Sequence, residues 1–121
     1  MPVANMSGVT IYHNPRCTKS RQTLALLQER GIKPAIIEYL QTPPTVKELE
    51  SLLGMLGMKP RDLIRKEESA YKDQALENER LTHGQLVHAM IRTPILIERP
   101  IVVNNGKAVI GRPPEKVLEI L

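Results

Sequence analysis

The chain is short of several residue types, and each shortage excludes a class of function. Among its 121 residues there is one cysteine, so no disulfide can form within the chain. It has no Phe or Trp and three Tyr, so it lacks the aromatic stacking surfaces of proteins that bind single-stranded nucleic acid. No apolar run approaches the roughly 20 residues of a membrane span. We therefore expect neither nucleic acid nor a membrane as a partner.

What the chain does contain fits a small, basic globular protein. Hydrophobic residues make up 41% of it, enough for one domain to bury a core. Its net charge of +4 indicates an anionic partner. A single cysteine, with no signal-like apolar segment near the N-terminus, predicts a reducing, cytoplasmic setting.

The first part of the chain has the pattern of two strands separated by a helix. Residues 9–12 and 35–40 are the strands, and the helix between them begins at Cys17 and stops at Gly31. Because the joints between these elements are short, we expect the two strands to be parallel neighbours.

Capping boxes, prolines and an Asn-Gly pair mark the remaining elements. They predict a helix over about 46–57 after Thr45 and Glu48, a short helix from Pro60, a helix over 83–92 after Thr82 and Gln85, a hairpin of strands 101–103 and 108–110, and a terminal helix over 115–121. This order predicts an α/β chain with a thioredoxin-like fold and a mostly helical insertion at about 42–94. We expect a single domain over 9–121 and a loose tail over 1–8.

Cys17 has the surroundings of a reactive thiol. It stands at a helix start, where unpaired N–H groups and the helix dipole favour thiolate, and Arg16, Lys19 and Arg21 add positive charge. A lone cysteine can equally be a small buried hydrophobe. The polar and basic neighbours favour the reactive interpretation.

Two familiar cysteine chemistries are excluded by single residues. A Cys-x-x-Cys oxidoreductase needs a second cysteine at position 20, which is Ser20. A phosphatase loop of cysteine, five residues and arginine needs arginine at position 23, which is Thr23. What remains is one nucleophile at an oxyanion-attracting helix start. The Ser20 hydroxyl can hydrogen-bond the thiolate there, or can simply be a first-turn helix residue.

Three arginines outside this loop are candidate oxyanion contacts. Arg99 and Arg112 flank the predicted hairpin, and Arg65 lies in the helical insertion. Guanidinium groups offer paired, permanently charged donors, although each arginine taken alone can be an ordinary surface charge. Pro100 precedes a strand, where either a cis or a trans bond is compatible with the sequence.

The three histidines differ in interest. His13 lies four residues before Cys17 and can act on the thiol or make a structural hydrogen bond. His83 and His88 have no cysteine or carboxylate at ligand spacing, so we predict no metal site.

Four segments are the basis of a resemblance to a known family: His13-Asn14-Pro15-Arg16-Cys17-x-x-Ser20-Arg21, the surroundings of Arg65, Glu98-Arg99-Pro100-Ile101-Val102-Val103 and Gly111-Arg112-Pro113. They resemble the glutaredoxin-coupled arsenate reductases, an ArsC-like family. The resemblance extends from Val9 to Leu121. Within the family, the chain is most similar to a short subgroup whose members end soon after the last helix. The best-known members have Gly and Thr where this chain has Thr18 and Lys19, and a longer C-terminal tail.

The resemblance implies an enzyme of arsenic detoxification that reduces arsenate to arsenite. Cys17 is implied as the nucleophile that forms a covalent adduct with arsenic, and His13 as a residue that lowers the thiol pKa. Arg65, Arg99 and Arg112 are implied as the oxyanion contacts. With one thiol, the chain must obtain electrons from glutathione as a co-substrate and from glutaredoxin. No metal or bound cofactor is expected.

Two other functions stay open at this level. One is a non-catalytic relative, similar to the Spx regulators, that binds a protein partner; these regulators usually sense through a Cys-x-x-Cys pair, which Ser20 breaks. The other is reduction of a different substrate by the same cysteine.

Overall fold

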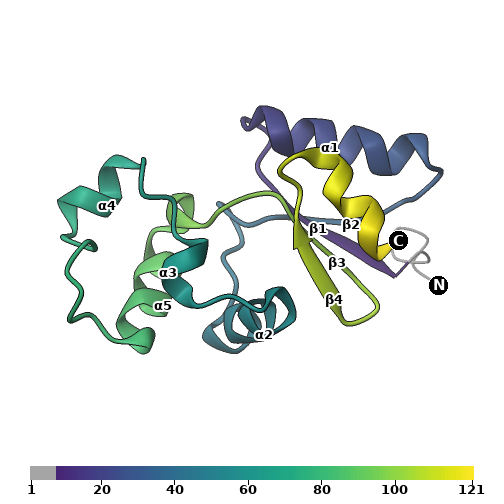
Figure 1. Ribbon diagram of the computed structural model, residues 1–121. Coiled ribbons are helices and arrows are strands. Elements are labelled where there is room, and N and C mark those ends of the chain that lie inside the picture. Colours follow the sequence, from purple (N-terminus) through teal and green to yellow (C-terminus); the bar gives the residue numbers. More distant parts are fainter. Residues whose placement is uncertain (1–7) are drawn as a thin grey trace. The chain divides into compact units, whose positions relative to one another are not determined.

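The computed structural model describes residues 8–121 and forms two compact units, shown in Figure 1. One unit takes in the chain up to Thr42 together with Arg99–Leu121, and the other is Pro43–Glu98. The loose tail predicted over 1–8 falls, apart from Gly8, outside the described residues. Across residues 8–121, no helix is long and apolar enough to cross a membrane.

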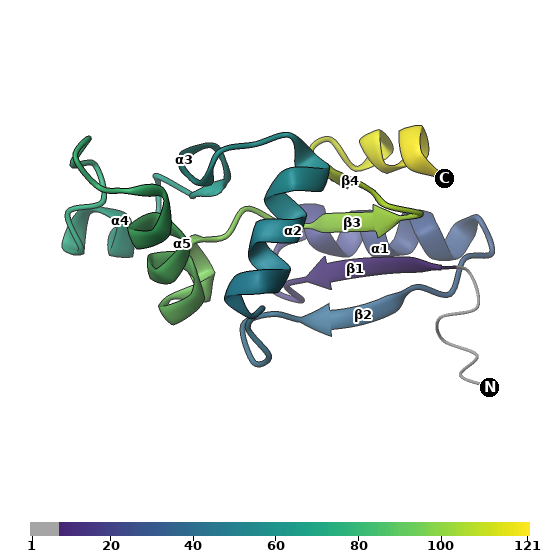
Figure 2. The same ribbon diagram turned by 90° about the horizontal axis from the view of Figure 1, so that it is seen from below.

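The first unit contains a four-stranded sheet. Its strands are β1 (Val9–His13), β2 (Ala35–Glu38), β3 (Ile101–Asn104) and β4 (Lys107–Ile110), in the order β2-β1-β3-β4 seen in Figure 2. β1 pairs with β2 in parallel, and β3 pairs antiparallel with both β1 and β4. The predicted parallel pair and hairpin are therefore confirmed, and the unit is of the mixed α/β class.

Two helices of this unit pack together against its sheet. Helix α1 (Thr18–Glu29) and the C-terminal 3-10 helix η3 (Pro114–Ile120) lie side by side in Figure 1. Their apolar faces close a core with the central strands, because those strands present alternate side chains to one face. The fully or nearly fully buried members of this core are Val9, Ile11, Leu27, Val102 and Val117.

Local signals set the ends of these elements. Cys17 is the residue at the N-terminal cap of α1, and Gly31 has the left-handed φ of 76° that ends the helix. Asn105 and Gly106 have φ of 53° and 77°, so the hairpin turn needs the two residue types that tolerate this conformation. These three predictions from the sequence are confirmed.

Most element boundaries lie within one or two residues of the sequence predictions, and strand β2 and the terminal helix show the clearest differences. β2 ends at Glu38 rather than at residue 40, because the carbonyl of Glu38 accepts hydrogen bonds from Gln41 and Thr42 and closes a turn. The terminal helix is a 3-10 helix that begins at Pro114. At seven residues it is longer than most 3-10 helices, which seldom exceed about three or four.

The second unit is helical. Leu49, Leu53 and Met90 are among the buried residues that hold its helices together. The Thr45–Glu48 and Thr82–Gln85 capping boxes are both formed, as predicted. The sequence patterns did not predict α4 or η2. The unit consists of α2 (Val46–Leu56), α3 (Pro60–Leu63), α4 (Ser69–Asp73), α5 (His83–Arg92) and the 3-10 helix η2 (Pro94–Leu96).

The core of the first unit predicts a large effect for one substitution on α1. Leu27 has no exposed surface, whereas Leu40, beyond β2, is 37% exposed. Leu27→Ala is expected to lower the free energy of unfolding by about 2–5 kcal/mol, because it leaves a cavity beside the sheet. Leu40→Ala is the matched control and should cost far less. Denaturant unfolding measures both, and equal losses would contradict this description of the core.

Candidate active site around Cys17

The loop before α1 is folded around the side chain and backbone of Asn14. The N–H of Cys17 donates to the Asn14 carbonyl at 3.0 Å, and the N–H of Arg16 donates to Asn14 Oδ1 at 3.0 Å. Asn14 itself is 2% exposed. Asparagine suits this position because its side chain can accept from the backbone two residues on. The loop therefore delivers Cys17 to the helix start in a fixed turn, with its thiol half-buried.

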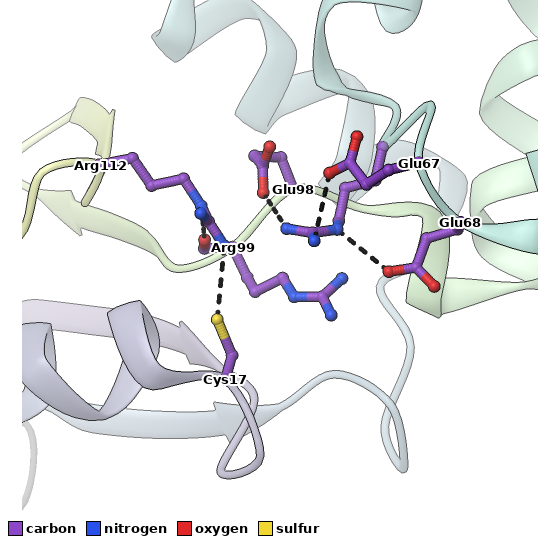
Figure 3. Close-up of polar contacts among 7 residues, drawn as sticks. Cys17, Glu67, Glu68, Glu98, Arg99 and Arg112 are labelled. Carbon is purple, nitrogen blue, oxygen red and sulfur yellow. Dashed lines mark hydrogen bonds and ion pairs between the residues drawn. The ribbon is translucent and has the colours of Figure 1, made fainter.

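Two predicted arginines reach this thiol from the ends of the hairpin. Arg112 Nη2 donates to Cys17 Sγ at 3.4 Å, as Figure 3 shows, across 95 positions of sequence. Arg112 Nε donates to the carbonyl oxygen of Arg99 at 2.8 Å, which holds the guanidinium in place. Arg99 is 7% exposed. The Arg99–Pro100 and Arg112–Pro113 peptide bonds are both cis, which answers the question that the sequence left open at Pro100.

The surroundings of Cys17 favour the thiolate. Burial raises the pKa of the thiol, but the backbone N–H of Ser20, a hydrogen bond from the Arg99 side chain and the charges of Arg112 and Arg99 lower it, and the net pKa lies below its ordinary value. Hydrogen bonds and positive charge act only on the ionised form, so they outweigh partial desolvation. Cys17 thus combines nucleophilic character with adjacent donors for an anion.

His13 and Ser20 form a buried pair beneath the loop. His13 Nδ1 lies 2.6 Å from Ser20 Oγ, which also accepts a hydrogen bond from the Asn14 N–H at 3.0 Å. The hydroxyl of Ser20 is therefore engaged by His13 and Asn14, and it is the Ser20 backbone that acts on Cys17. Burial lowers the pKa of His13, Glu38 raises it and Arg21 lowers it again, with a net pKa below 6.5.

Arg65 belongs to the second unit, where three carboxylates surround its guanidinium. Nη1 lies 2.7 Å from Glu98, Nη2 lies 3.1 Å from Glu67 and Nε lies 3.2 Å from Glu68. Dashed lines in Figure 3 mark these contacts at the three labelled glutamates. The Arg65 side chain is 15% exposed. Burial lowers its pKa, but Glu98 and the other two carboxylates raise the pKa above its usual range. The guanidinium is thus held in one orientation by its own unit.

The structure brings together five of the six predicted site residues in the first unit, and adds others. His13, Cys17, Ser20, Arg99 and Arg112 share one site, and Arg65 has its own surroundings in the second unit. Sequence reasoning missed Asn14, whose position before a proline is a turn signal. It also missed the glutamates around Arg65. Glu67 and Glu68 follow within one helical turn, but the place of Glu98 had no local signal.

The model of the ArsC family matches residues 12–120, which is most of the chain and includes every residue of the site.

The chain belongs to the ArsC family.

Similar proteins cover nearly the whole length of this ArsC chain. It is 54% identical to the uncharacterized protein YfgD of Escherichia coli K12, over 93% of this chain and 96% of that protein. It is 51% identical to an arsenate reductase of Haemophilus influenzae, over 94% of this chain and 99% of the relative. The structure of an arsenate reductase from Vibrio cholerae superposes with a TM-score of 0.92 at 54% identity, covering 93% of this chain and 97% of that one. The superposition on this ArsC-family structure confirms the thioredoxin-like fold that the sequence predicts.

The lowered pKa of Cys17 predicts that its alkylation has a low pH midpoint. The rate of reaction with iodoacetamide should rise with a midpoint below the roughly 8.5 of a free thiol. Arg112→Gln is expected to move the midpoint upward, because it removes the donor to Sγ. Arg30→Gln is the matched control, since Arg30 follows the far end of α1, roughly 20 Å away along the helix. A midpoint that is the same in both variants would contradict this assignment.

The lowered pKa of His13 predicts a specific dependence of stability on pH. Below pH 6.5 the unfolded chain binds a proton at residue 13 that the folded chain resists, so stability falls as the pH drops from 6.5 through the folded pKa. His13→Gln should remove this component, so the stability advantage of the parent chain should shrink over that range and stay constant above it. Denaturant unfolding from pH 5 to 8 measures this, with the exposed His88→Gln as control. An advantage that grows on acidification would refute the sign.

Proposed function

We propose that this chain is an arsenate reductase in which Cys17 is the nucleophile. The observation that carries the proposal is the 3.4 Å contact of Cys17 Sγ with Arg112 Nη2, which joins a thiol of lowered pKa to a permanently charged donor. Arsenate is chosen as the substrate because the Haemophilus relative, named an arsenate reductase, is 51% identical to this chain. Membership of the ArsC family supports the same choice.

The site has donors of the kind that a tetrahedral oxyanion requires. Arg99 and Arg112 offer paired N–H groups beside the thiol, and the first turn of α1 offers backbone N–H groups at the positive end of its dipole. Arg65 is proposed as a third contact from the family resemblance. Three of its N–H groups face carboxylates, so an arriving oxyanion competes with Glu67, Glu68 and Glu98 for them.

The reaction follows from having one thiol. The Cys17 thiolate attacks arsenic(V), a sulfur–arsenic bond forms, and one arsenate oxygen leaves as water while the arginines balance the anionic charge. We propose that a glutathione thiol then forms a second sulfur–arsenic bond, as another arsenate oxygen leaves as water. A glutaredoxin thiolate attacks the sulfur of this glutathione, so a glutathione–glutaredoxin disulfide forms, the bond from that sulfur to arsenic breaks, and its electron pair reduces arsenic(V) to arsenic(III). Water then cleaves the bond between arsenic and Cys17, which releases arsenite and the free thiol. In total, arsenic gains two electrons from two external thiols, which become one disulfide. Because glutathione keeps the cytoplasm reducing, we propose that the enzyme acts in the cytoplasm.

Phosphate provides a useful contrast to arsenate. The two anions share charge and tetrahedral shape, so both fit the same donors. Thiols do not reduce phosphorus(V), however, so phosphate is expected to inhibit competitively and not to react. The chemistry of the central atom, and not the shape of the site, then supplies much of the selectivity.

The proposal predicts arsenate-dependent turnover that needs Cys17. Purified protein with glutathione, glutaredoxin, glutathione reductase and NADPH should oxidise NADPH when arsenate is added, and phosphate should raise the apparent KM. Cys17→Ser is expected to abolish turnover, because an alcohol at this position is a far weaker nucleophile at neutral pH. Absence of turnover above the Cys17→Ser control would overturn the assignment.

The electron donor is tested separately from the substrate. Omitting glutaredoxin while keeping glutathione should stop turnover, and thioredoxin with its reductase should not replace it. If thioredoxin sustains the same rate, the donor is wrong while the arsenate assignment stands.

A further inference from the structure

Gly111 stands immediately before Arg112 in a place that leaves no room for a side chain. A Cβ built there would lie 2.6 Å from Thr23 Oγ1, 3.1 Å from Thr23 Cγ2 and 2.9 Å from Pro100 Cγ. Its φ lies outside the left-handed region, so the backbone conformation is open to any residue. Glycine is therefore required at this position by space and not by conformation.

The neighbours of Gly111 belong to the segments that carry the other site residues. Thr23 is fully buried on α1, the helix that begins at Cys17, and its hydroxyl donates to the Lys19 carbonyl at 2.8 Å. Pro100 follows Arg99 directly, and its carbonyl accepts the Gly111 N–H at 3.0 Å. Gly111 is thus pressed between the helix of the nucleophile and the segment of the buried arginine.

Beyond Gly111, the position of Arg112 depends on short contacts. Its backbone N–H donates to the Ile110 carbonyl at 2.8 Å, and its Nε donates to the Arg99 carbonyl at 2.8 Å. Its Nη2 reaches Cys17 Sγ at 3.4 Å. A methyl group at position 111 would have to move away from Thr23 by about 1 Å to reach ordinary van der Waals contact. A shift of that size at the preceding residue is enough to break the bond to the thiol.

We propose that Gly111 is a positioning residue for the chemistry at Cys17. Its close contact with Thr23 sets the distance between the hairpin and α1, and so places the Arg112 guanidinium on the sulfur. In this proposal Gly111 acts on the thiol through Arg112. This inference rests on the role of Cys17 in the proposed function, but its test needs no arsenate.

The first measurement is the pH profile of Cys17 alkylation by iodoacetamide in Gly111→Ala. The midpoint should rise by half a unit or more, which is about a threefold loss of thiolate at pH values below the midpoint. Gly54→Ala is the matched control, because nothing lies within 4 Å of a Cβ at this position on α2, and its midpoint should equal that of the parent chain. Thermal unfolding establishes that each variant is folded.

A double-mutant cycle separates positioning from general damage to the fold. In the Arg112→Gln background, Gly111→Ala should cause no further rise of the midpoint, because the guanidinium through which it acts is gone. Adding Thr23→Ala to Gly111→Ala removes two of the three close atoms and should restore part of the midpoint. If Gly111→Ala does not fold, Thr23→Val takes its place in the cycle, since it puts a larger group against Gly111.

The outcomes decide the proposal either way. A folded Gly111→Ala variant with the parent midpoint overturns it, and so does an equal rise in the presence and absence of Arg112. If the parent chain does not turn over arsenate, the proposed function is wrong, but the effect of Gly111 on the midpoint of Cys17 alkylation stands. A raised midpoint of alkylation that depends on Arg112 would support the positioning role of Gly111, even if the substrate proves to be another oxyanion.

Discussion

A thiolate that is half-buried at a helix start is stable only when hydrogen-bond donors and positive charge replace the water it has lost. In this chain the Ser20 backbone and the side chains of Arg99 and Arg112 provide that replacement. The two arginines lie more than 80 residues from Cys17 in sequence. The sheet, the crossover helix and the hairpin of the first unit bring these distant segments together at one point. The fold of that unit therefore stabilises the negative charge on the Cys17 sulfur.

Patterns confined to neighbouring residues predicted most of the fold. The two capping boxes, the glycine after α1 and the Asn105-Gly106 turn each act within a few residues, and each is found where the sequence indicates it. The failures have the opposite character. Helix α4 has five residues and no buried side chain, so it leaves no apolar periodicity to detect. The early end of β2 depends on a turn whose donors carry no distinctive side chains.

In the candidate site, too, local features were predicted from the sequence and contacts between distant residues were not. Cys17 was identified from its local surroundings, but the contact with Arg112 spans 95 positions and follows from strand pairing, which local patterns do not fix. Ser20 shows the limit within one helical turn: the sequence left open whether its hydroxyl bonds the thiolate, and in the structure that hydroxyl contacts His13 and Asn14. Arg65 was predicted as an oxyanion contact, and the sequence did not indicate that three glutamates hold its guanidinium. At this site the residue types are readable from the sequence, but the partners of their hydrogen bonds are not.

The antiparallel pairing of β3 and β4 has a consequence for how this chain can change in length. Ile101 pairs with Ile110, and Arg99 and Arg112 each stand two residues beyond this pair in sequence, at the open end of the hairpin. Their separation is set by the number of residues in each strand, counted from the paired isoleucines. Residues added at the tip, around Asn105 and Gly106, lie at the opposite end and leave that count unchanged. A residue added within either strand shifts one arginine to the other face of the sheet. Variation in length can therefore accumulate at the tip, while the strands must keep their lengths.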